Sequence, residues 1–240
     1  ARRLQAAGCD IIRAAVPDRE AVPLIAALKE AVSIPVVADI HFDYRLALEA
    51  AAAGVDKIRI NPGNIGDESR VKAVADACRQ RRIPIRIGVN AGSLEKEILA
   101  KYGHPTAEAM RDSALYHASL LEKFDFDDII LSIKSSDVPT MVRAYQLTAE
   151  ACPYPLHVGV TEAGTERMGL IKSAAGIGAL LLQGGRWRRA STCCGGSGCG
   201  KTSPCWCPAP PAGARASTLS ASPDRWRSGC APSTSRLPWR

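Results

Sequence analysis

Residues 185–240 contain no Ile, Val, Met, Phe, Tyr, His, Asn, Gln or Glu. Residues 1–184 contain no Trp, because all four Trp lie in the second segment, together with six of the nine Cys. The second segment carries eight Arg and one Lys against one acid, so the net charge of +7 for the whole chain leaves the first segment at −1. The high isoelectric point therefore does not make residues 1–184 a basic, nucleic-acid-binding domain.

Long apolar runs and clustered cysteines are also absent from the first segment. No apolar run reaches roughly 18 residues, the length that predicts a membrane-spanning helix. The three cysteines, Cys9, Cys78 and Cys152, are far apart, which argues against a disulfide scaffold and is typical of a cytosolic protein. We therefore expect a cytoplasmic protein. Residues 1–8 resemble the end of a helix rather than a signal peptide, and no Met precedes them, so we expect the natural N-terminus to lie upstream.

Short runs rich in Val and Ile recur along the first segment, and helical patterns separate them. The runs occupy residues 10–16, 34–40, 57–61, 83–90, 128–134 and 156–160, and the helical patterns occupy residues 19–32, 44–53, 68–81, 107–123 and 138–152. Runs that are apolar throughout, rather than at every second position, indicate strands buried on both faces of a parallel sheet. The alternation of strands and helices predicts either a (β/α)8 barrel or a doubly wound sheet.

Polar residues follow five of these strands, and their distribution distinguishes the two folds. The polar groups are Asp39 and His41; Arg59, Asn61 and Asn64; Arg86 and Asn90; Ser132, Lys134 and Ser135; and His157, Thr161 and Glu162. Groups at nearly every strand end converge only if the strands form a ring, whereas an open sheet gathers them at one switch point. We predict an incomplete (β/α)8 TIM-type barrel over residues 1–184, with about six of eight strands and one missing at each end. A disordered, low-complexity tail is expected over residues 185–240.

Four basic residues lie on or at the ends of the expected strands, namely Lys57, Arg59, Arg86 and Lys134. For any one of these residues by itself, a salt bridge inside the ring is as good an explanation as contact with a ligand. Four such residues beside few acids favour an anionic ligand, and the planar fork of Arg suits phosphate oxygens. The loop at residues 61–66 (NPGNIG) offers backbone N–H groups before a helix, an arrangement that can bind phosphate. For each single Gly, however, an ordinary turn is a better explanation than phosphate binding. Together these groups suit a small ligand that carries phosphate or diphosphate.

Six motifs extend this interpretation. They occupy residues 38–43 (ADIHFD), 59–64 (RINPGN), 86–94 (RIGVNAGSL), 132–136 (SIKSS), 159–164 (GVTEAG) and 169–178 (GLIKSAAGIG). Because these six motifs occur in this order, the chain resembles the barrel domain of the 4-hydroxy-3-methylbut-2-enyl diphosphate synthase family. The resemblance covers residues 2–184 and does not extend into the tail.

The resemblance implies an oxidoreductase of non-mevalonate isoprenoid biosynthesis. Enzymes of this family open the ring of 2-C-methyl-erythritol 2,4-cyclodiphosphate reductively to give 4-hydroxy-3-methylbut-2-enyl diphosphate. A [4Fe–4S] cluster, held by three Cys and one Glu of a separate C-terminal domain, delivers electrons from flavodoxin or ferredoxin. The resemblance also implies a homodimer when the protein is intact, and we expect neither a nucleic-acid partner nor a membrane partner.

On this resemblance we assign eight residues to substrate binding: Arg59, Asn61, Arg86, Asn90, Ser93, Lys134, Ser135 and His157. The basic members of this set are expected to hold the diphosphate, and the others to support them. Glu162 is a candidate catalytic acid near the ring oxygen, although a structural pairing with a barrel Arg explains it equally well.

The tail departs from the family. A last strand is expected soon after residue 184, followed by a cluster domain that opens with Cys-Pro-Ser/Thr-Cys-Gly-Arg, and neither is present in frame. The tail has the composition of GC-rich DNA read in a wrong frame. In the shifted frame, permitted codons for residues 207–213 can encode Ser-Cys-Pro-Thr-Cys-Gly-Arg. We interpret the tail as frameshifted, and we expect the chain as written to bind no metal or cluster and to be inactive.

Two other functions fit the sequence. One is another (β/α)8 enzyme for a phosphate-bearing ligand, of the pterin-synthase type, which needs no cluster; anaerobic reconstitution with iron and sulfide would distinguish it from the synthase. The other is a non-catalytic fragment whose basic tail binds nucleic acid. That function predicts salt-dependent DNA binding that is lost when residues 185–240 are deleted.

The frameshift makes a prediction about the gene. We expect the nucleotide sequence after the codons for Gly184 and Gly185 to continue, in the alternative frame, into a cluster domain with a third Cys and a Glu. Sequencing of this region checks it. The frameshift account fails if the alternative frame reaches a stop codon before those ligands.

Overall fold

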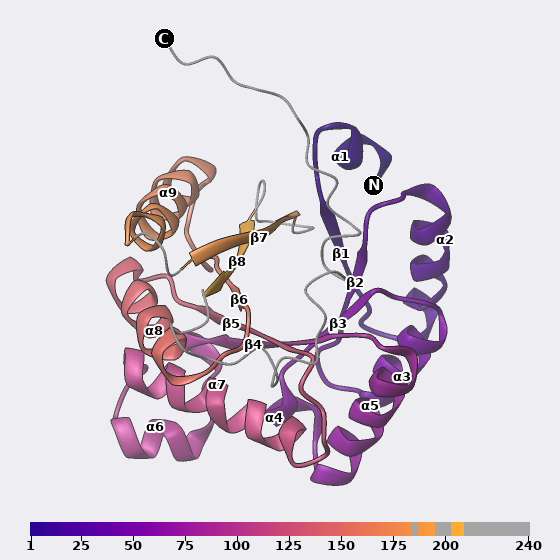
Figure 1. The fold of residues 1–240 in the computed structure, drawn as a ribbon, viewed down its shortest axis with the longest axis horizontal. Helices are drawn as coiled ribbons and strands as arrows, with labels where there is room; N and C mark the ends of the chain where they lie inside the picture. Colours follow the sequence, from indigo (N-terminus) through magenta and orange to yellow (C-terminus); the bar gives the residue numbers. More distant parts are fainter. Residues whose placement is uncertain (184–186, 195–202, 209–240) are drawn as a thin grey trace, which may run out of the picture. The chain divides into compact units, whose positions relative to one another are not determined.

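Six parallel strands form the framework of the computed structural model, which describes residues 1–183, 187–194 and 203–208. They are β1 (Ile11–Ala15), β2 (Val36–Asp39), β3 (Lys57–Ile60), β4 (Ile85–Asn90), β5 (Ile129–Lys134) and β6 (Leu156–His157). Each strand pairs in parallel with the next strand along the chain. All six lie within the predicted runs, so the parallel barrel architecture is confirmed (Figure 1).

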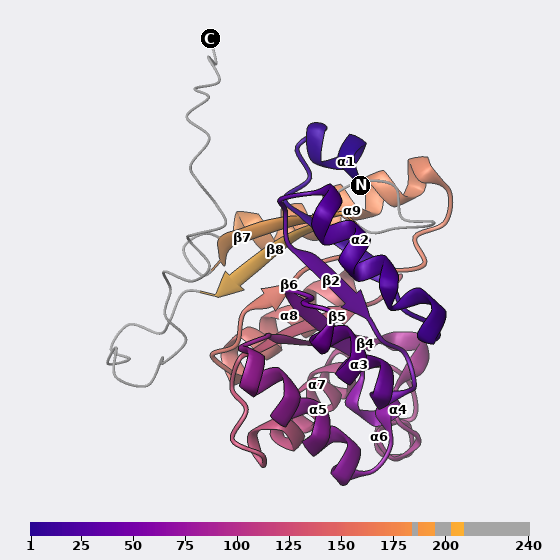
Figure 2. The same cartoon turned by 90° about the vertical axis from the view of Figure 1, so that its right-hand side faces the viewer.

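Helices surround the strands, as the two views in Figures 1 and 2 show. They are α1 (Arg2–Ala6), α2 (Pro23–Ala31), α3 (Tyr44–Ala52), α4 (Pro62–Ile65), α5 (Glu68–Arg81), α6 (Lys96–Tyr102), α7 (Ala107–Glu122), α8 (Val138–Ala151) and α9 (Glu166–Leu182), with short 3-10 turns η1 (Arg19–Ala21) and η2 (Ala91–Ser93). The five predicted helical patterns correspond to η1 with α2, and to α3, α5, α7 and α8. Within the described residues, we find no helix with the length and apolar character needed to cross a membrane.

Side-chain caps fix where the helices begin after the strand-end loops. The side chains of Asp43, Asp67, Thr106, Asp137 and Thr165 accept hydrogen bonds from backbone N–H groups in the first turns of α3, α5, α7, α8 and α9. Such a cap satisfies a donor that has no partner within the helix. The loops between strand ends and helices are therefore held at their helical end.

Two further strands, β7 (Trp187–Cys194) and β8 (Ser203–Pro208), close the ring in the order β1-β2-β3-β4-β5-β6-β8-β7. β7 is parallel to β1, but β8 is antiparallel to both β6 and β7, unlike the strands of a complete (β/α)8 barrel. These two segments are the part of the tail that the structure describes. The open edges of β1 and β6 offer backbone groups that an extended chain can pair with. The rest of the predicted tail lies outside the described residues.

The outer face of the six strands is apolar. Ile58, Ile60, Ile85, Ile87 and Leu131 are among the strand residues that join helix residues in one buried core. Burial of such side chains between strands and helices contributes most of the favourable free energy of folding. The barrel is thus held together from the outside of the ring, between the strands and the helices.

The inner face of the same strands is polar. Pairing places Asp39 beside Arg59 and Arg59 beside Arg86, so these three side chains share the inner face. Gly88 pairs with Ser132, and Asn90 pairs with Lys134, on the same face. Our description of the strands as apolar throughout was therefore wrong for β3 and β4. In β3 the inner positions are the charged Lys57 and Arg59, and in β4 they are Arg86, Gly88 and Asn90, while the outer positions of both strands are apolar. A ring with charged residues on its inner face differs from a TIM barrel filled with Val, Ile and Leu.

The buried Tyr145 of α8 links β5 to β6 where the two strands separate. Its hydroxyl accepts a hydrogen bond from the Ile133 N–H at 3.0 Å and donates one to the His157 carbonyl at 2.6 Å. Only one residue pair, Leu131 with Leu156, joins these strands directly. The Tyr145 hydroxyl therefore takes the place of a direct backbone hydrogen bond between β5 and β6.

We expect Tyr145→Phe to lower the free energy of unfolding by about 2 kcal/mol, because a buried N–H and a buried carbonyl lose their shared partner. Urea unfolding of the full chain measures this effect. Tyr116→Phe is the matched control, since Tyr116 is 52% exposed. Equal effects of the two substitutions would contradict the role given to the Tyr145 hydroxyl.

Candidate functional site

Eight of the nine residues assigned to the site from the sequence lie at or just beyond the carboxyl ends of β3 to β6, whereas Arg86 is the second residue of β4 and lies deeper on the inner face. Those on the strands are Arg59, Arg86, Asn90, Lys134 and His157, and those in the loops that follow are Asn61, Ser93, Ser135 and Glu162. Arg86, His157, Ser135 and Asn61 are only 4 to 5% exposed, whereas Ser93 and Glu162 are exposed. The topology therefore gathers eight of them at one end of the ring, and strand pairing places Arg86 beside Arg59 on the inner face.

Asp39 holds two arginines on the inner face. Its carboxylate accepts a hydrogen bond from Arg59 Nη1 at 2.9 Å and forms an ion pair with Arg13 Nε at 3.5 Å. His41 Nε2 lies 3.9 Å from the same carboxylate. Burial by itself raises the pKa of Asp39, but the charges of Arg59 and Arg13 more than offset this effect and hold the pKa below its ordinary value. Asp39 therefore stays ionised and fixes both guanidinium groups.

Gly88 makes room for the Arg59 guanidinium. A Cβ atom at position 88 would lie 2.7 Å from Arg59 Nε and 2.9 Å from Arg59 Nη2, closer than such atoms approach. Arg59 Nε is buried and has no hydrogen-bond partner among the described residues. The glycine thus allows the guanidinium to lie across the inner face of β4, with a donor left for another acceptor.

Arg86 and His157 are in direct contact. Arg86 Nη1 lies 3.1 Å from His157 Nε2, and both side chains are buried. The contact joins β4 to β6 across the inner face, and the carbonyl of His157 is the one that Tyr145 holds. Because the guanidinium only donates, the Nε2 atom of His157 accepts in this pair.

The loop after β5 is fixed by its neighbours. The Asp137 N–H donates to Ser135 Oγ at 3.1 Å, and Lys172 of α9 donates to the Ser136 carbonyl at 3.0 Å. Lys134, the last residue of β5, is partly buried beside these contacts. The segment with Lys134 and Ser135 is therefore held by both α8 and α9.

Glu162 lies in the loop between β6 and α9, close to the loop after β4. A Cβ atom at Gly92 would be 3.9 Å from Glu162 Oε1, so the carboxylate faces the η2 turn that carries Ser93. Glu162 has a φ of +48°, a left-handed conformation that is uncommon for a residue with a side chain. Strained backbone of this kind gathers at functional sites.

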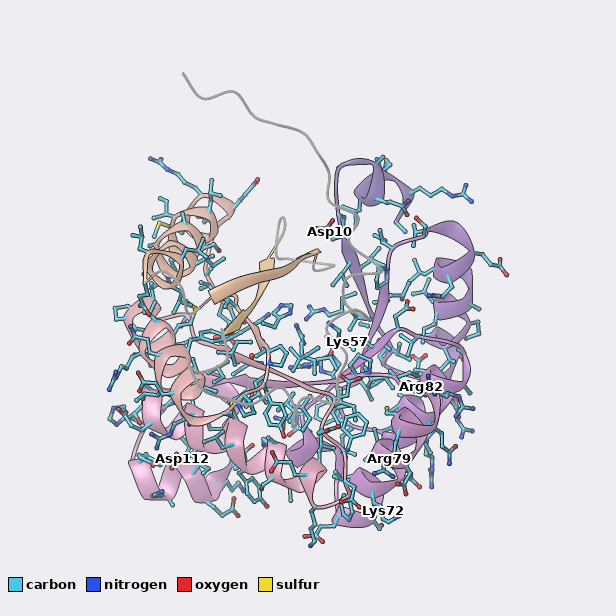
Figure 3. The ribbon with its side chains drawn as sticks, viewed as in Figure 1. Asp10, Lys57, Lys72, Arg79, Arg82 and Asp112 are labelled. Carbon is cyan, nitrogen blue, oxygen red and sulfur yellow. The ribbon has the colours of Figure 1, made fainter. Side chains whose placement is uncertain are left out.

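The residues assigned to the site from the sequence do not include four inner-face residues, Arg13, Asp39, Lys57 and Gly88, although Lys57 was counted among the basic residues that favour an anionic ligand and Asp39 among the polar groups at strand ends. Lys57 is 4% exposed, and Figure 3 shows it in the middle of the ring rather than among the helices. A charged residue between apolar neighbours in a strand was the signal that could have identified Arg13, as it did Arg59. No local signal marks Gly88, because its role depends on Arg59 from another strand.

Residues 1–186 match the family described as the GcpE TIM-barrel domain. The chain belongs to this family. Two relatives, from Bacillus cytotoxicus and Bacillus cereus, are each 58% identical over 183 residues, which cover 76% of this chain and 50% of theirs. Both are described as 4-hydroxy-3-methylbut-2-en-1-yl diphosphate synthase (flavodoxin). The GcpE-family chain thus spans about half the length of the curated relatives it matches.

Solved structures give the same fold. Two complexes of Yersinia pestis dihydropteroate synthase, one with a pterine-sulfa conjugate and one with a sulfonamide drug, are each similar with a TM-score of 0.52. They are 14% and 15% identical, and the match covers 77% of this chain and 77% and 75% of theirs. Identity this low shows a shared barrel fold and nothing about the ligand.

Within residues 1–183, the side chains that the structure describes supply no ligand set for an iron–sulfur cluster. No group of three or more Cys, His, Asp or Glu gathers among them in a way that could hold a metal ion. The three cysteines of this part of the chain are far apart in the fold: Cys9 lies in the loop before β1, Cys78 in α5 and Cys152 just after α8. Burial raises the pKa of Cys78 to about 12 and also raises the pKa of Cys152, so both side chains are protonated thiols at neutral pH.

We expect Asp39→Asn to cost about 3 kcal/mol of stability at neutral pH, because one charge of a buried ion pair is removed. The pKa of Asp39 is lowered by folding, so its contribution is complete above the ordinary value of about 4 and is lost as the pH falls through the folded value. Unfolding of both proteins across this pH range should show the difference narrowing below about pH 4. Glu30→Gln is the control, because Glu30 is exposed. If the difference in free energy of unfolding between the unsubstituted chain and Asp39→Asn stays constant with pH, the ion pair does not make the contribution described.

Proposed function

We propose that the described barrel is the substrate-binding part of a 4-hydroxy-3-methylbut-2-enyl diphosphate synthase, and that its ligand is 2-C-methyl-erythritol 2,4-cyclodiphosphate. The observation that carries the proposal is the charge of the inner face: Arg13, Lys57, Arg59, Arg86 and Lys134 lie on six strands whose only acid is Asp39. Such a surface attracts an anion, and a diphosphate is the anion of the relatives' named product.

In this proposal Arg59, Arg86 and Lys134 bind the diphosphate oxygens. Arg59 is the firmest assignment, since Asp39 orients it and its Nε donor is buried without a partner among the described residues. Asn61, Asn90, Ser93, Ser135 and His157 complete the surrounding polar surface. A guanidinium held in place before the ligand arrives loses little entropy on binding, which favours tight binding.

Glu162 is the proposed acid near the ring oxygen. Its exposed carboxylate faces the η2 turn from the opposite loop, and its backbone has an uncommon left-handed conformation. A carboxyl group placed within hydrogen-bond reach of a leaving oxygen can supply the proton that the oxygen needs. The pairing with a barrel Arg that the sequence left open does not occur among the ion pairs of the described residues.

The reductive step has no ligand set within the described residues. We infer that the [4Fe–4S] cluster, and the flavodoxin or ferredoxin that reduces it, belong to the part of the relatives that this chain does not match. The chain as written is therefore proposed to bind substrate without reducing it. The division into a barrel over residues 1–184 and a frameshifted tail over residues 185–240 is part of the same proposal, as are a homodimer of the intact protein and a cytoplasmic location.

The pterin-synthase alternative has less support. The likeness to dihydropteroate synthase is a likeness of fold at 14 to 15% identity, whereas the synthase relatives are 58% identical over the whole barrel. The nucleic-acid alternative depends on the tail, most of which lies outside the described residues.

We expect isothermal titration of the full chain to detect binding of 2-C-methyl-erythritol 2,4-cyclodiphosphate, and Lys134→Met to weaken it about 10- to 100-fold, the effect of losing a hydrogen bond to a charged group. Lys96→Met is the matched control, because Lys96 is exposed on α6. Equal affinities of the two variants, or binding of a pterin in preference to the cyclic diphosphate, would refute the proposal.

A further inference from the structure

A buried polar cluster joins the loop after β4 to α7. Glu95 lies between η2 and α6, and Ser113 and His117 approach it from α7. The two α7 residues are four positions apart, so their side chains lie on the same face of the helix. Both have 0% exposure, and the Glu95 side chain is 18% exposed. The cluster belongs to none of the sets of inner-face residues described above.

The Glu95 carboxylate accepts from both partners. Ser113 Oγ donates to Oε2 at 2.7 Å, and His117 Nε2 forms a short hydrogen bond with Oε1. Because an ionised carboxylate can only accept, the Nε2 atom of His117 carries the hydrogen. Burial by itself raises the pKa of Glu95, but the hydrogen bonds from His117 and Ser113 reverse this and bring the pKa to about 2. The Glu95 carboxylate is therefore ionised at neutral pH and accepts two hydrogen bonds.

Glu95 lies at one end of a very short loop. The other end is Asn90, which the sheet fixes beside Lys134 of β5. Between them, Leu94 is 7% exposed, and Gly92 faces the Glu162 carboxylate. The η2 turn is thus held at both ends while its outer side faces the proposed acid.

We propose that Glu95 is a positioning residue: its carboxylate, held by Ser113 and His117, fixes the turn that carries Ser93 against Glu162 and so completes the ligand-binding end of β4. The inference rests on the proposed function for what this turn binds. It adds a residue that touches no ligand but sets where the ligand-facing groups lie. The alternative is that the cluster only fastens α6 to α7.

The chain offers a matched control for that alternative. Asp112 of α7 forms an ion pair with Lys101 of α6 at 3.1 Å and a hydrogen bond with Tyr102. These contacts join the same two helices at the far end of α6, and Figure 3 shows Asp112 near the outer edge, away from Lys57. Asp112→Ala therefore removes a helix–helix link without touching the η2 turn.

The first test is hydrogen–deuterium exchange of the full 240-residue chain. We expect Glu95→Ala to speed the exchange of the amides at residues 91–94 by about tenfold or more, because both hydrogen bonds to the charged carboxylate are lost. Glu95→Gln should restore most of the protection, because its oxygen can accept from His117 and its NH2 can donate to Ser113. Asp112→Ala should leave these amides unchanged.

Ser113→Ala covers the case in which Glu95→Ala does not fold. It removes one of the two hydrogen bonds and should speed exchange at residues 91–94 by a smaller factor. The inference is overturned if the folded Glu95 or Ser113 variants leave these amides unchanged, or if Asp112→Ala affects them equally.

The second test is the binding of inorganic pyrophosphate to the same proteins. We expect Glu95→Ala to weaken binding about tenfold, with Glu95→Gln and Asp112→Ala close to the unsubstituted chain. Unchanged affinity in Glu95→Ala would refute the part that Glu95 is given in ligand binding. If the unsubstituted chain does not bind pyrophosphate, the proposed anion site fails, and the exchange measurements still decide whether Glu95 positions the turn.

Discussion

The burial of positive charge inside a ring of strands is the constraint on which the rest of this structure depends. A buried charge is costly unless it is paired, and removing one partner of a buried pair costs more than the pair contributes. Asp39 meets this requirement for Arg13 and Arg59, and Gly88 provides the space that the Arg59 guanidinium needs. The inner face keeps an excess of basic residues because β1 to β6 carry no other acid. An anionic ligand is the natural complement of that excess.

The contacts outside the ring hold the strand ends in place. Tyr145 joins β5 to β6 at His157, Lys172 holds the loop after β5, and Glu95 holds the loop after β4. Each of these residues comes from a helix or a loop, and each acts on the backbone or loop that carries a site residue. The helices thus do more than cover the apolar face of the strands, because they also set the distances between groups that would share one ligand.

Local patterns in the sequence were sufficient for much of this fold. The six strands lie within the predicted runs, and the polar groups at their ends correctly indicated a ring. The helix α9 was missed because its own apolar and small residues occupy all of its sides, so no polar face marks it as a helix. Leu170 and Leu182, for example, are 72% and 89% exposed. The short helix α6 has too few residues to show a period.

The contacts between distant positions were out of reach of those patterns. The link from Arg59 to Gly88 and the cluster of Glu95 with His117 join residues 29 and 22 positions apart, and pairing of that kind is fixed only by the tertiary fold. The strands β7 and β8 come from a segment whose composition gave no reason to expect them. Composition describes what a segment prefers by itself, whereas these strands pair with edges that the barrel provides.

The central claim is that the inner face and the carboxyl ends of β3 to β5 form one anion site, and a crystal structure of the chain grown with 2-C-methyl-erythritol 2,4-cyclodiphosphate tests it most directly. The account predicts phosphate oxygens within hydrogen-bond distance of Arg59, Arg86 and Lys134, with Asp39 still paired to Arg59. A ligand bound elsewhere, or an inner face that binds no anion while these side chains keep the positions described, would contradict it.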